Sequence, residues 1–336
     1  MSFAALSEKE QADRLGELAR SALLAFGFEG ARVSLLKYRE NAVFRIDADG
    51  TPPHVLRVHR PGYRSDAEIE SEIAWMRAVS ASGIRTPSLV VARDGSLVVT
   101  RSASGVPEPR QCDLQGWIEG TALGSLEAGV DLDAATLRSV YRTVGRVAAE
   151  LHAHGERWRR PEGFVRPSWD ANALVGDTPV FGAFWDLPEL DGATRDALLR
   201  ARDRSRRVLE KLPAPSLLVH GDLIPDNLLV AGDALHVIDF DDCGTSSVAF
   251  EIATTLFPLR LMGGYDDALA GMLEGYRAVR PLDDDEIALL PDLLLARGLS
   301  YLGWPIGRPE IASQRPIVPF LAQALVAMAA ELEGGG

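Results

Sequence analysis

The sequence predicts an α+β protein of two lobes, in which an antiparallel sheet with one helix precedes a larger, mainly helical lobe. The chain has 336 residues, of which 46% are hydrophobic. This length exceeds what one compact core usually holds. Short runs of branched residues fill the first third, and long stretches of helical periodicity begin near Gly120. We expect residues 1–115 to form the first lobe and residues 116–336 the second.

The first lobe should open with a helix followed by three strands. Ser7 and Glu10 have the spacing of a helix capping box, and leucines follow at roughly helical intervals. Branched residues separated by turn residues then predict an antiparallel meander over Val33 to Leu36, Ala42 to Ile46 and His54 to Val58.

A second helix and two further strands should complete this lobe. Ser65 and Glu68 form another capping box, and Gly83 ends the apolar stripe that follows. Beyond it, the turn Arg93-Asp94-Gly95 predicts a hairpin between Leu89 to Ala92 and Leu97 to Thr100.

The second lobe should consist of long helices around a few short strands. Helical periodicity is found near residues 134–154, 192–211, 264–278, 284–302 and 315–333, and β-like pieces occur between Leu217 and Phe240. Residues 155–190 show little periodicity and receive no assignment.

Charge and cysteine content restrict the class of partner. A formal net charge of −13 and a pI near 5.0 argue against nucleic acid or anionic lipid. Cys112 and Cys243 lie far apart without metal-ligand spacing, which predicts neither a disulfide framework nor a zinc site. The N-terminus lacks the order of a signal peptide, and no uncharged apolar stretch reaches membrane-spanning length. We therefore expect a cytoplasmic protein that binds neither nucleic acid nor membrane.

The strongest functional signal lies in residues 219–242. Asp222, Asn227 and Asp239 are bracketed there by apolar, strand-like runs, which place polar groups on loops fixed by a buried scaffold. Asp and Asn also favour turns for local reasons, so each residue alone would indicate only a turn. Three of them at these intervals favour a functional site.

The three side chains suit phosphoryl transfer. This reaction needs one carboxylate to orient the attacking hydroxyl and accept its proton, and oxygen ligands to hold magnesium against the nucleotide phosphates. Asp222 suits the first task, and Asn227 and Asp239 suit the second.

With these residues the sequence resembles, over nearly its whole length, the aminoglycoside phosphotransferase and choline kinase superfamily. That superfamily includes type II homoserine kinases and shares its core with protein kinases. Its H-G-D-x-x-x-x-N loop and its later I-D-[FW] segment correspond here to 220–227 and 238–240. The resemblance implies a protein-kinase-like fold, ATP as phosphoryl donor, Asp222 as catalytic residue, and Mg²⁺ held by Asn227 and Asp239.

The resemblance also implies nucleotide contacts in the first lobe. Arg57 occupies the strand position where the family usually carries a phosphate-binding lysine, and it keeps the charge with a different reach and planar geometry. Glu72 matches the helix carboxylate that pairs with that cation, although a solvated surface role is the alternative for it.

The same resemblance implies two further nucleotide contacts. The turn around Asn41 should cover the nucleotide phosphates, although it contains no glycine. Gly116, Trp117 and Ile118 fall where the family's hinge offers backbone groups to adenine.

Three other functions stay open. A metal-dependent hydrolase could surround two metal ions with His220, Asp222, Asp239 and the two carboxylates that follow it, whereas in the family the histidine supports the catalytic loop. A nucleotide-binding pseudokinase would account for Arg57 and the turn without glycine. A protein Ser/Thr kinase of the same superfamily is the third, because residues 239–242 resemble its metal segment.

The acceptor cannot be assigned by analogy of fold. An acidic protein with an Asp base favours the approach of a cation over an anion. We therefore expect a small hydroxyl-bearing acceptor with an amine, such as an amino alcohol, a hydroxy amino acid or an aminoglycoside-like compound.

Overall fold

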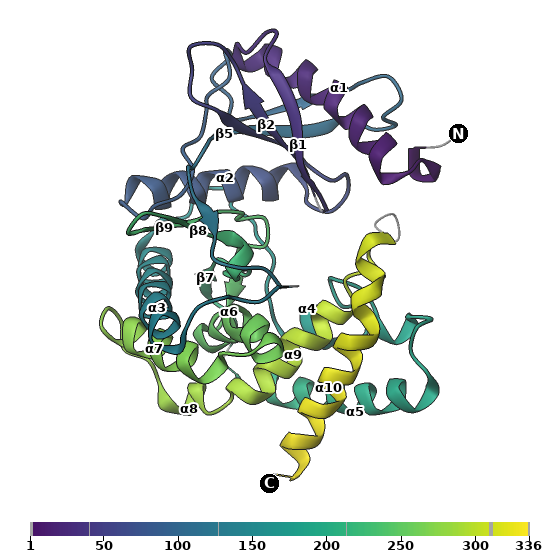
Figure 1. Cartoon of the computed structure of the whole chain (residues 1–336), viewed down its shortest axis with the longest axis vertical. Coiled ribbons are helices and arrows are strands. Elements are labelled where there is room, and N and C mark those ends of the chain that lie inside the picture. The colour runs from purple at the N-terminus through teal and green to yellow at the C-terminus, as the bar shows by residue number, and fades with distance from the viewer. Residues whose placement is uncertain (1–2, 40, 127, 213, 309–311, 335–336) are drawn as a thin grey trace. The chain divides into compact units, whose positions relative to one another are not determined.

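The computed structural model describes residues 3–39, 41–126, 128–212, 214–308 and 312–334. The chain divides into two compact units, of which the first contains Met1–Glu119 with Arg160–Val165 and the second contains Gly120–Arg159 with Arg166–Gly336. The predicted fold class is confirmed, since an antiparallel five-stranded sheet comes first and a mainly helical unit follows (Figure 1). The assignment of the nucleotide to one lobe and of the acceptor to the other stays a prediction.

The first unit is built on one antiparallel sheet with strand order β1-β2-β3-β5-β4. Its strands are β1 (Arg32–Tyr38), β2 (Ala42–Asp47), β3 (His54–Val58), β4 (Val98–Arg101) and β5 (Arg110–Gly116). Buried and partly exposed residues alternate along β2, as expected for a strand with one face on a core.

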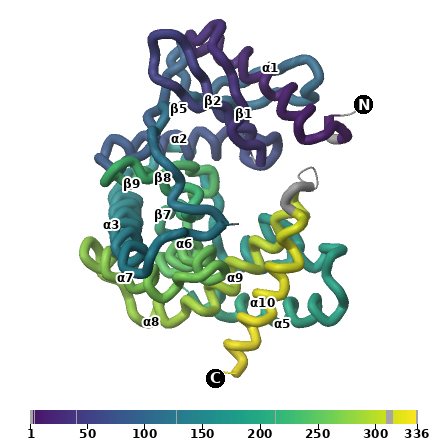
Figure 2. The backbone as a smooth tube through the Cα atoms, viewed as in Figure 1, coloured from purple at the N-terminus to yellow at the C-terminus, as the bar shows by residue number. Residues whose placement is uncertain are grey.

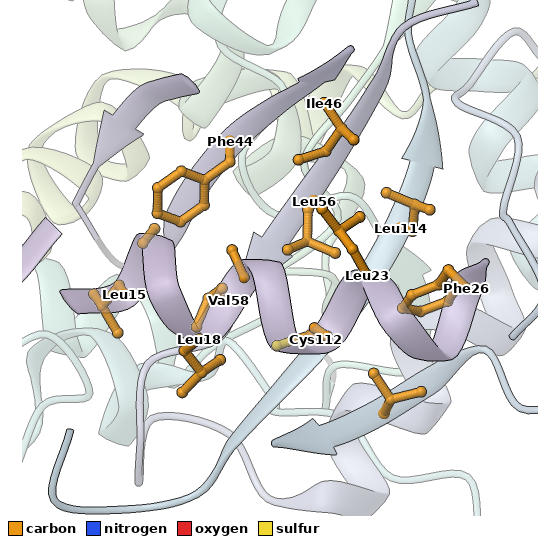
Figure 3. Packing of buried hydrophobic residues seen from close by; sticks show 14 of the residues in the cluster. Leu15, Leu18, Leu23, Phe26, Phe44, Ile46, Leu56, Val58, Cys112 and Leu114 are labelled. Carbon is orange, nitrogen blue, oxygen red and sulfur yellow. The ribbon is translucent and has the colours of Figure 1, made fainter. Parts of the chain in front are cut away.

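Helix α1 (Glu8–Phe26) covers one face of this sheet. Both hydrogen bonds of the capping box between Ser7 and Glu10 are present, and Gly27 ends the helix in the left-handed conformation. Figure 3 shows leucines and Phe26 of the helix packed against apolar side chains of β2, β3 and β5. Removal of this apolar surface from water is the main stabilising contribution within the unit.

The connection from α2 (Asp66–Ala81) to the last strands differs from the predicted hairpin. Leu89 forms only an isolated bridge to Gln115, and the partner of β4 is β5. Sequence reasoning missed β5 because Arg110, Asp113 and Gln115 interrupt its apolar pattern. All three are nevertheless buried, since they are paired with other polar groups.

Helices dominate the second unit: α3 (Ala134–Arg157), α4 (Ala171–Val175), α5 (Gly192–Leu209), α6 (Val248–Met262), α7 (Tyr265–Arg277), α8 (Asp284–Ile287), α9 (Leu290–Leu302) and α10 (Val318–Gly334). Helices α3 and α7 lie side by side (Figure 2). A Cβ atom on Gly275 of α7 would lie 1.9 Å from the carbonyl oxygen of Arg142 on α3, so this close approach requires glycine.

Two helices depart from the periodicity analysis. Helix α6 was not predicted, because all of Val248–Leu259 is buried and no polar face marks a helical period. The single helix predicted for 284–302 is divided into α8 and α9, and Pro291 lies in the first turn of α9, where a missing N–H is tolerated.

Short strands bracket the segment that carries the functional signal. Strand β7 (Leu217–Val219) pairs with β10 (Gly244–Ser246), and β8 (Leu228–Ala231) pairs with β6 (Thr121–Ala122) and β9 (Ala234–Val237). A 3-10 turn over Pro225–Asn227 leads into β8. The β-like pieces predicted between Leu217 and Phe240 are therefore present.

The C-terminal helix is also notably apolar. By length and composition alone, Arg315–Gly334 could cross a membrane, a test that core helices of water-soluble proteins also pass. Helix α10 packs against α5 and α9 through Leu321, Leu325 and neighbouring residues.

Candidate active site

The loop after β7 brings Asp222 and Asn227 together. Asn227 Nδ2 donates to Asp222 Oδ2 at 2.8 Å and to the Asp222 carbonyl oxygen at 2.9 Å. Gly221 precedes them with φ of +82°, and a Cβ there would lie 2.2 Å from the carbonyl oxygen of Asp242. Only glycine permits this conformation and this close approach, so the H-G-D order has a steric reason.

His220 supports the loop from within. Its Nε2 lies 3.0 Å from the carbonyl oxygen of Ile238, and its Nδ1 lies 3.3 Å from the backbone nitrogen of Asp222. The imidazole is fully buried and packs on the Phe240 ring. Because both ring nitrogens have partners within the protein, the geometry favours the supporting role of His220 over the hydrolase interpretation.

Glu251 of α6 holds the backbone at the start of the same loop. Its two carboxylate oxygens accept the backbone N–H of His220 at 3.1 Å and of Gly221 at 2.9 Å. Burial raises the pKa of this carboxyl to about 7, against the lowering effect of the two hydrogen bonds. Sequence reasoning missed Glu251, and the available signal was a single acidic residue within the apolar run 248–259.

Replacing Glu251 should change how stability depends on pH. Its folded-state pKa lies above the ordinary value of 4.5, so its contribution is present below about pH 4.5 and is lost as pH rises through about 7. The free energy of unfolding of the wild type should therefore fall over this range by on the order of 3 kcal/mol. Glu251→Gln should lack this decline in denaturant unfolding at pH 5 and pH 8. It should also be less stable at pH 5, because one amide oxygen cannot replace two acceptors. The same pH dependence in both proteins would show that another group is responsible.

Asp239 directly follows β9. It is the one non-glycine residue with positive φ, +64°, in the part of the chain that the structure describes. Ile238 donates its N–H to the carbonyl oxygen of Asn227 at 3.0 Å, which joins this segment to the loop that carries Asp222 and Asn227. Such backbone conformations often occur at functional sites.

Arg166 and Trp169 fix the segment after Asp239. Arg166 Nε donates to the carbonyl oxygen of Cys243 at 2.7 Å, and Nη2 donates to that of Asp241. Trp169 Nε1 donates to the carbonyl oxygen of Asp242 at 2.8 Å. Both residues lie in residues 155–190, where no periodic pattern indicates an element or a site.

Arg297 of α9 contacts the candidate base directly. Its Nη2 donates to Asp222 Oδ1 at 2.8 Å, so both carboxylate oxygens of Asp222 are oriented by a partner. Asp222 keeps 22% of its side chain exposed, whereas Arg297 keeps only 6%. This arginine was not among the predicted site residues.

In the first unit, Arg57 lies in a buried polar network. Its Nε donates to Asp113 Oδ2 at 3.0 Å and its Nη2 to Glu72 Oε1 at 2.5 Å. Glu72 is fully buried, so the surface alternative for this residue is wrong. The pairing that the resemblance implied for Arg57 and Glu72 is present.

Asp113 joins this network to two further side chains. His59 Nε2 lies 2.8 Å from Asp113 Oδ2, and Gln115 Nε2 donates to Asp113 Oδ1 at 2.7 Å. Burial by itself raises the pKa of Asp113, but the charge of Arg57 and these hydrogen bonds outweigh it. The pKa of this carboxyl therefore lies well below its usual range.

This arrangement predicts that lysine cannot simply replace Arg57. Arg57 donates to two carboxylates through two different nitrogens, and an ammonium would leave Asp113 poorly paired. Arg57→Lys should destabilise the protein by about 1 to 3 kcal/mol and raise the KM for ATP, and a second substitution, Asp113→Asn, should recover part of both losses. Arg32→Lys on β1, where an exposed arginine pairs with Asp47, serves as the control. Wild-type stability and KM in Arg57→Lys alone would show that Asp113 does not require the guanidinium.

The other predicted nucleotide contacts have partners of their own. Asn41 Oδ1 accepts the backbone N–H of Arg60 at 3.1 Å. Gly116 donates its N–H to Ser88 at 2.8 Å and Trp117 donates to Pro53 at 3.2 Å. Of the three predicted adenine contacts, only the N–H of Ile118 has no hydrogen-bond acceptor among the described residues.

The fold and the loop geometry define the class of protein as a phosphotransferase with a kinase-like fold. A family description, the phosphotransferase enzyme family, matches residues 35–282. The chain belongs to that family, as the resemblance predicted. It is a small-molecule kinase with an alcohol group as acceptor.

One curated relative and two solved structures are similar to this chain over most of its length. A homoserine kinase of Rhizobium etli is 30% identical over 283 residues, which cover 79% of this chain and 78% of that protein. The solved structure of a microcompartment-associated aminopropanol kinase has a TM-score of 0.83 at 30% identity and covers 95% of this chain and 98% of that one. An amicoumacin kinase in complex with AMP-PNP, Ca²⁺ and Ami has a TM-score of 0.74 at 18% identity, over 95% and 96% of the two chains. This last likeness concerns the fold.

Proposed function

We propose that the protein transfers the γ-phosphate of ATP to the hydroxyl of a small, amine-bearing acceptor, with Asp222 as the base. The observation that carries this proposal is the carboxylate of Asp222, oriented on both oxygens by Asn227 and Arg297. Each carboxylate oxygen has a further lone pair, so Asp222 can still accept a hydrogen bond from the acceptor hydroxyl. As that hydroxyl attacks, its proton passes to Asp222.

Asn227 and Asp239 are the proposed ligands of magnesium. The Asn227 amide nitrogen is used on Asp222, which leaves its Oδ1 as the atom for a metal ion. Magnesium prefers oxygen ligands and commonly takes one or two from the protein and the others from phosphates and water. Two oxygen-bearing side chains on adjoining segments fit this requirement. When bound, the ion would neutralise charge on the nucleotide phosphates.

Arg57 and Ile118 are the proposed nucleotide contacts of the first unit. The planar guanidinium of Arg57 is fixed by Glu72 and Asp113, which suits a cation that orients phosphate oxygens. The backbone N–H of Ile118 is suited to donate a hydrogen bond to a ring nitrogen of adenine. Asn41 is used to hold the backbone of Arg60, so we assign it a supporting role in the phosphate-covering turn.

Two features support the proposed acceptor and compartment. Homoserine and aminopropanol, the compounds named for two relatives, each carry a hydroxyl and an amine. Cys112 and Cys243 are buried and form no disulfide bond, which suits a reducing compartment such as the cytoplasm.

The proposal is tested by a screen of ATP consumption with and without magnesium. Acceptors should include amino alcohols, hydroxy amino acids, aminoglycosides and a generic protein substrate. We expect magnesium-dependent consumption with a small amine-bearing alcohol. Nucleotide binding without turnover of any acceptor would indicate the pseudokinase alternative, and phosphorylation of the protein substrate alone would indicate the protein kinase alternative.

A further inference from the structure

Arg297 has hydrogen-bonding capacity that its contact with Asp222 does not use. Only 5% of the residue is exposed, and its Nη2 donates to Asp222 Oδ1. In the described ranges of the chain, its Nη1 and Nε have no hydrogen-bond partner. A guanidinium carries five N–H donors, so most of its donors remain for a ligand.

Aromatic rings hold this guanidinium in place. Arg297 Cζ lies 5.8 Å from the centroid of the Phe181 ring and 5.9 Å from that of Tyr301. The faces of rings at this distance attract a guanidinium and restrict its orientation. Arg308, which is 1% exposed, packs on the same Phe181 ring at 5.5 Å and brings a second positive charge to this aromatic cluster.

A buried guanidinium with unused donors is suited to a carboxylate. Removing such a cation from water costs several kcal/mol unless charged or polar partners compensate. The planar edge formed by two of its nitrogens matches the two oxygens of a carboxylate. An amino alcohol offers no such group, whereas a hydroxy amino acid offers one next to its hydroxyl-bearing chain.

We propose that Arg297 binds a carboxylate of the acceptor, so that the acceptor is a hydroxy amino acid and not a simple amino alcohol. This inference rests on the proposed function, because Asp222 must be the base that faces the acceptor hydroxyl. One guanidinium then contacts both the base and the acceptor, and it places the hydroxyl at a fixed distance from Asp222. The net charge of −13 had favoured cationic acceptors. The positive charge of Arg297 favours an acceptor that carries an anionic group in addition to its amine.

Matched pairs of acceptors test this directly, because each pair differs only by the carboxylate. L-homoserine is compared with 3-amino-1-propanol, and L-serine with ethanolamine, by kcat/KM in an ATP-consumption assay. The wild type should prefer the amino acid by about 10- to 100-fold, the usual worth of a charge-assisted hydrogen bond. Equal efficiency, or a preference for the amino alcohols, would overturn the proposal.

Substitution of Arg297 distinguishes recognition of the acceptor carboxylate from a role limited to orienting Asp222. Arg297→Lys keeps a positive charge near Asp222 but lacks the planar edge, so the amino acid should lose more efficiency than the amino alcohol and the ratio should approach one. If Arg297 only orients Asp222, both acceptors should lose equally and the ratio should not change, which would contradict the proposal. Arg204→Lys on α5, where the arginine pairs with Asp292, is the matched control and should leave the ratio at its wild-type value.

Failure of the proposed function can be told apart from failure of this inference. If no acceptor is phosphorylated, the same pairs are titrated calorimetrically into the protein with AMP-PNP. Tighter binding of the amino acid that is lost in Arg297→Lys would support the carboxylate site without any turnover. Turnover with an unchanged ratio would instead refute the carboxylate site and leave the kinase assignment standing.

Discussion

Asp222→Asn should lower kcat by about 10²- to 10⁴-fold while the protein still folds and binds ATP. The amide is nearly the same shape and keeps one acceptor oxygen, so only one of the contacts with Asn227 and Arg297 is lost, and His220 and Glu251 still hold the loop. It cannot take the proton of the acceptor hydroxyl, so the loss should appear in kcat and not in the affinity for ATP. Steady-state kinetics and an ATP titration of the same preparation measure the two effects.

Asp226→Asn provides a control within the same loop. Asp226 accepts the backbone N–H of Leu126 at 3.0 Å, a contact that an asparagine oxygen can keep. This variant should retain kcat within a few-fold of the wild type. Wild-type turnover in Asp222→Asn, or equal losses in the two variants, would remove Asp222 from the role of base.

Asp239→Ala should abolish magnesium-dependent nucleotide binding and turnover. A hard cation held by few protein oxygens cannot readily replace a lost carboxylate. Calorimetric titration of ATP with and without magnesium should show the metal effect in the wild type and none in the variant. An unchanged magnesium effect would exclude Asp239 as the ligand.

The backbone at Asp239 calls for a second variant. Its φ of +64° is unfavourable for alanine, so Asp239→Ala could also lose local structure. Asparagine tolerates this conformation well, so Asp239→Asn should fold. It should nevertheless bind magnesium more weakly than the wild type does, because it lacks the negative charge. Asp233→Ala, in the exposed turn between β8 and β9, is the control and should behave like the wild type.

Local signals were sufficient for most of the fold. The capping boxes at Ser7 and Ser65 correctly placed the first two helices, because their hydrogen bonds join residues three apart. Helix α6 and strand β5 were missed for opposite reasons. Helix α6 is buried on every side, and β5 carries polar residues whose partners come from other parts of the chain.

The residues of the candidate site divide in the same way into those with a local sequence signal and those without one. Asp222, Asn227 and Asp239 belong to one short stretch with a recognisable spacing, so the sequence indicated them. Glu251, Arg297 and Arg166 act on this stretch from positions distant in sequence. Only the tertiary structure brings such residues together, and no local pattern marks them.

Identification of the phosphorylated product decides whether the protein transfers a phosphoryl group to the acceptor with Asp222 as the base. The protein is incubated with ATP, magnesium and the acceptor selected by the screen, and the products are analysed by mass spectrometry. We expect ADP and an acceptor with one added phosphoryl group on its hydroxyl. Both should be formed by the wild type and by Asp226→Asn and greatly reduced in Asp222→Asn. ADP with free phosphate and an unmodified acceptor, or equal product from Asp222→Asn, would contradict this expectation.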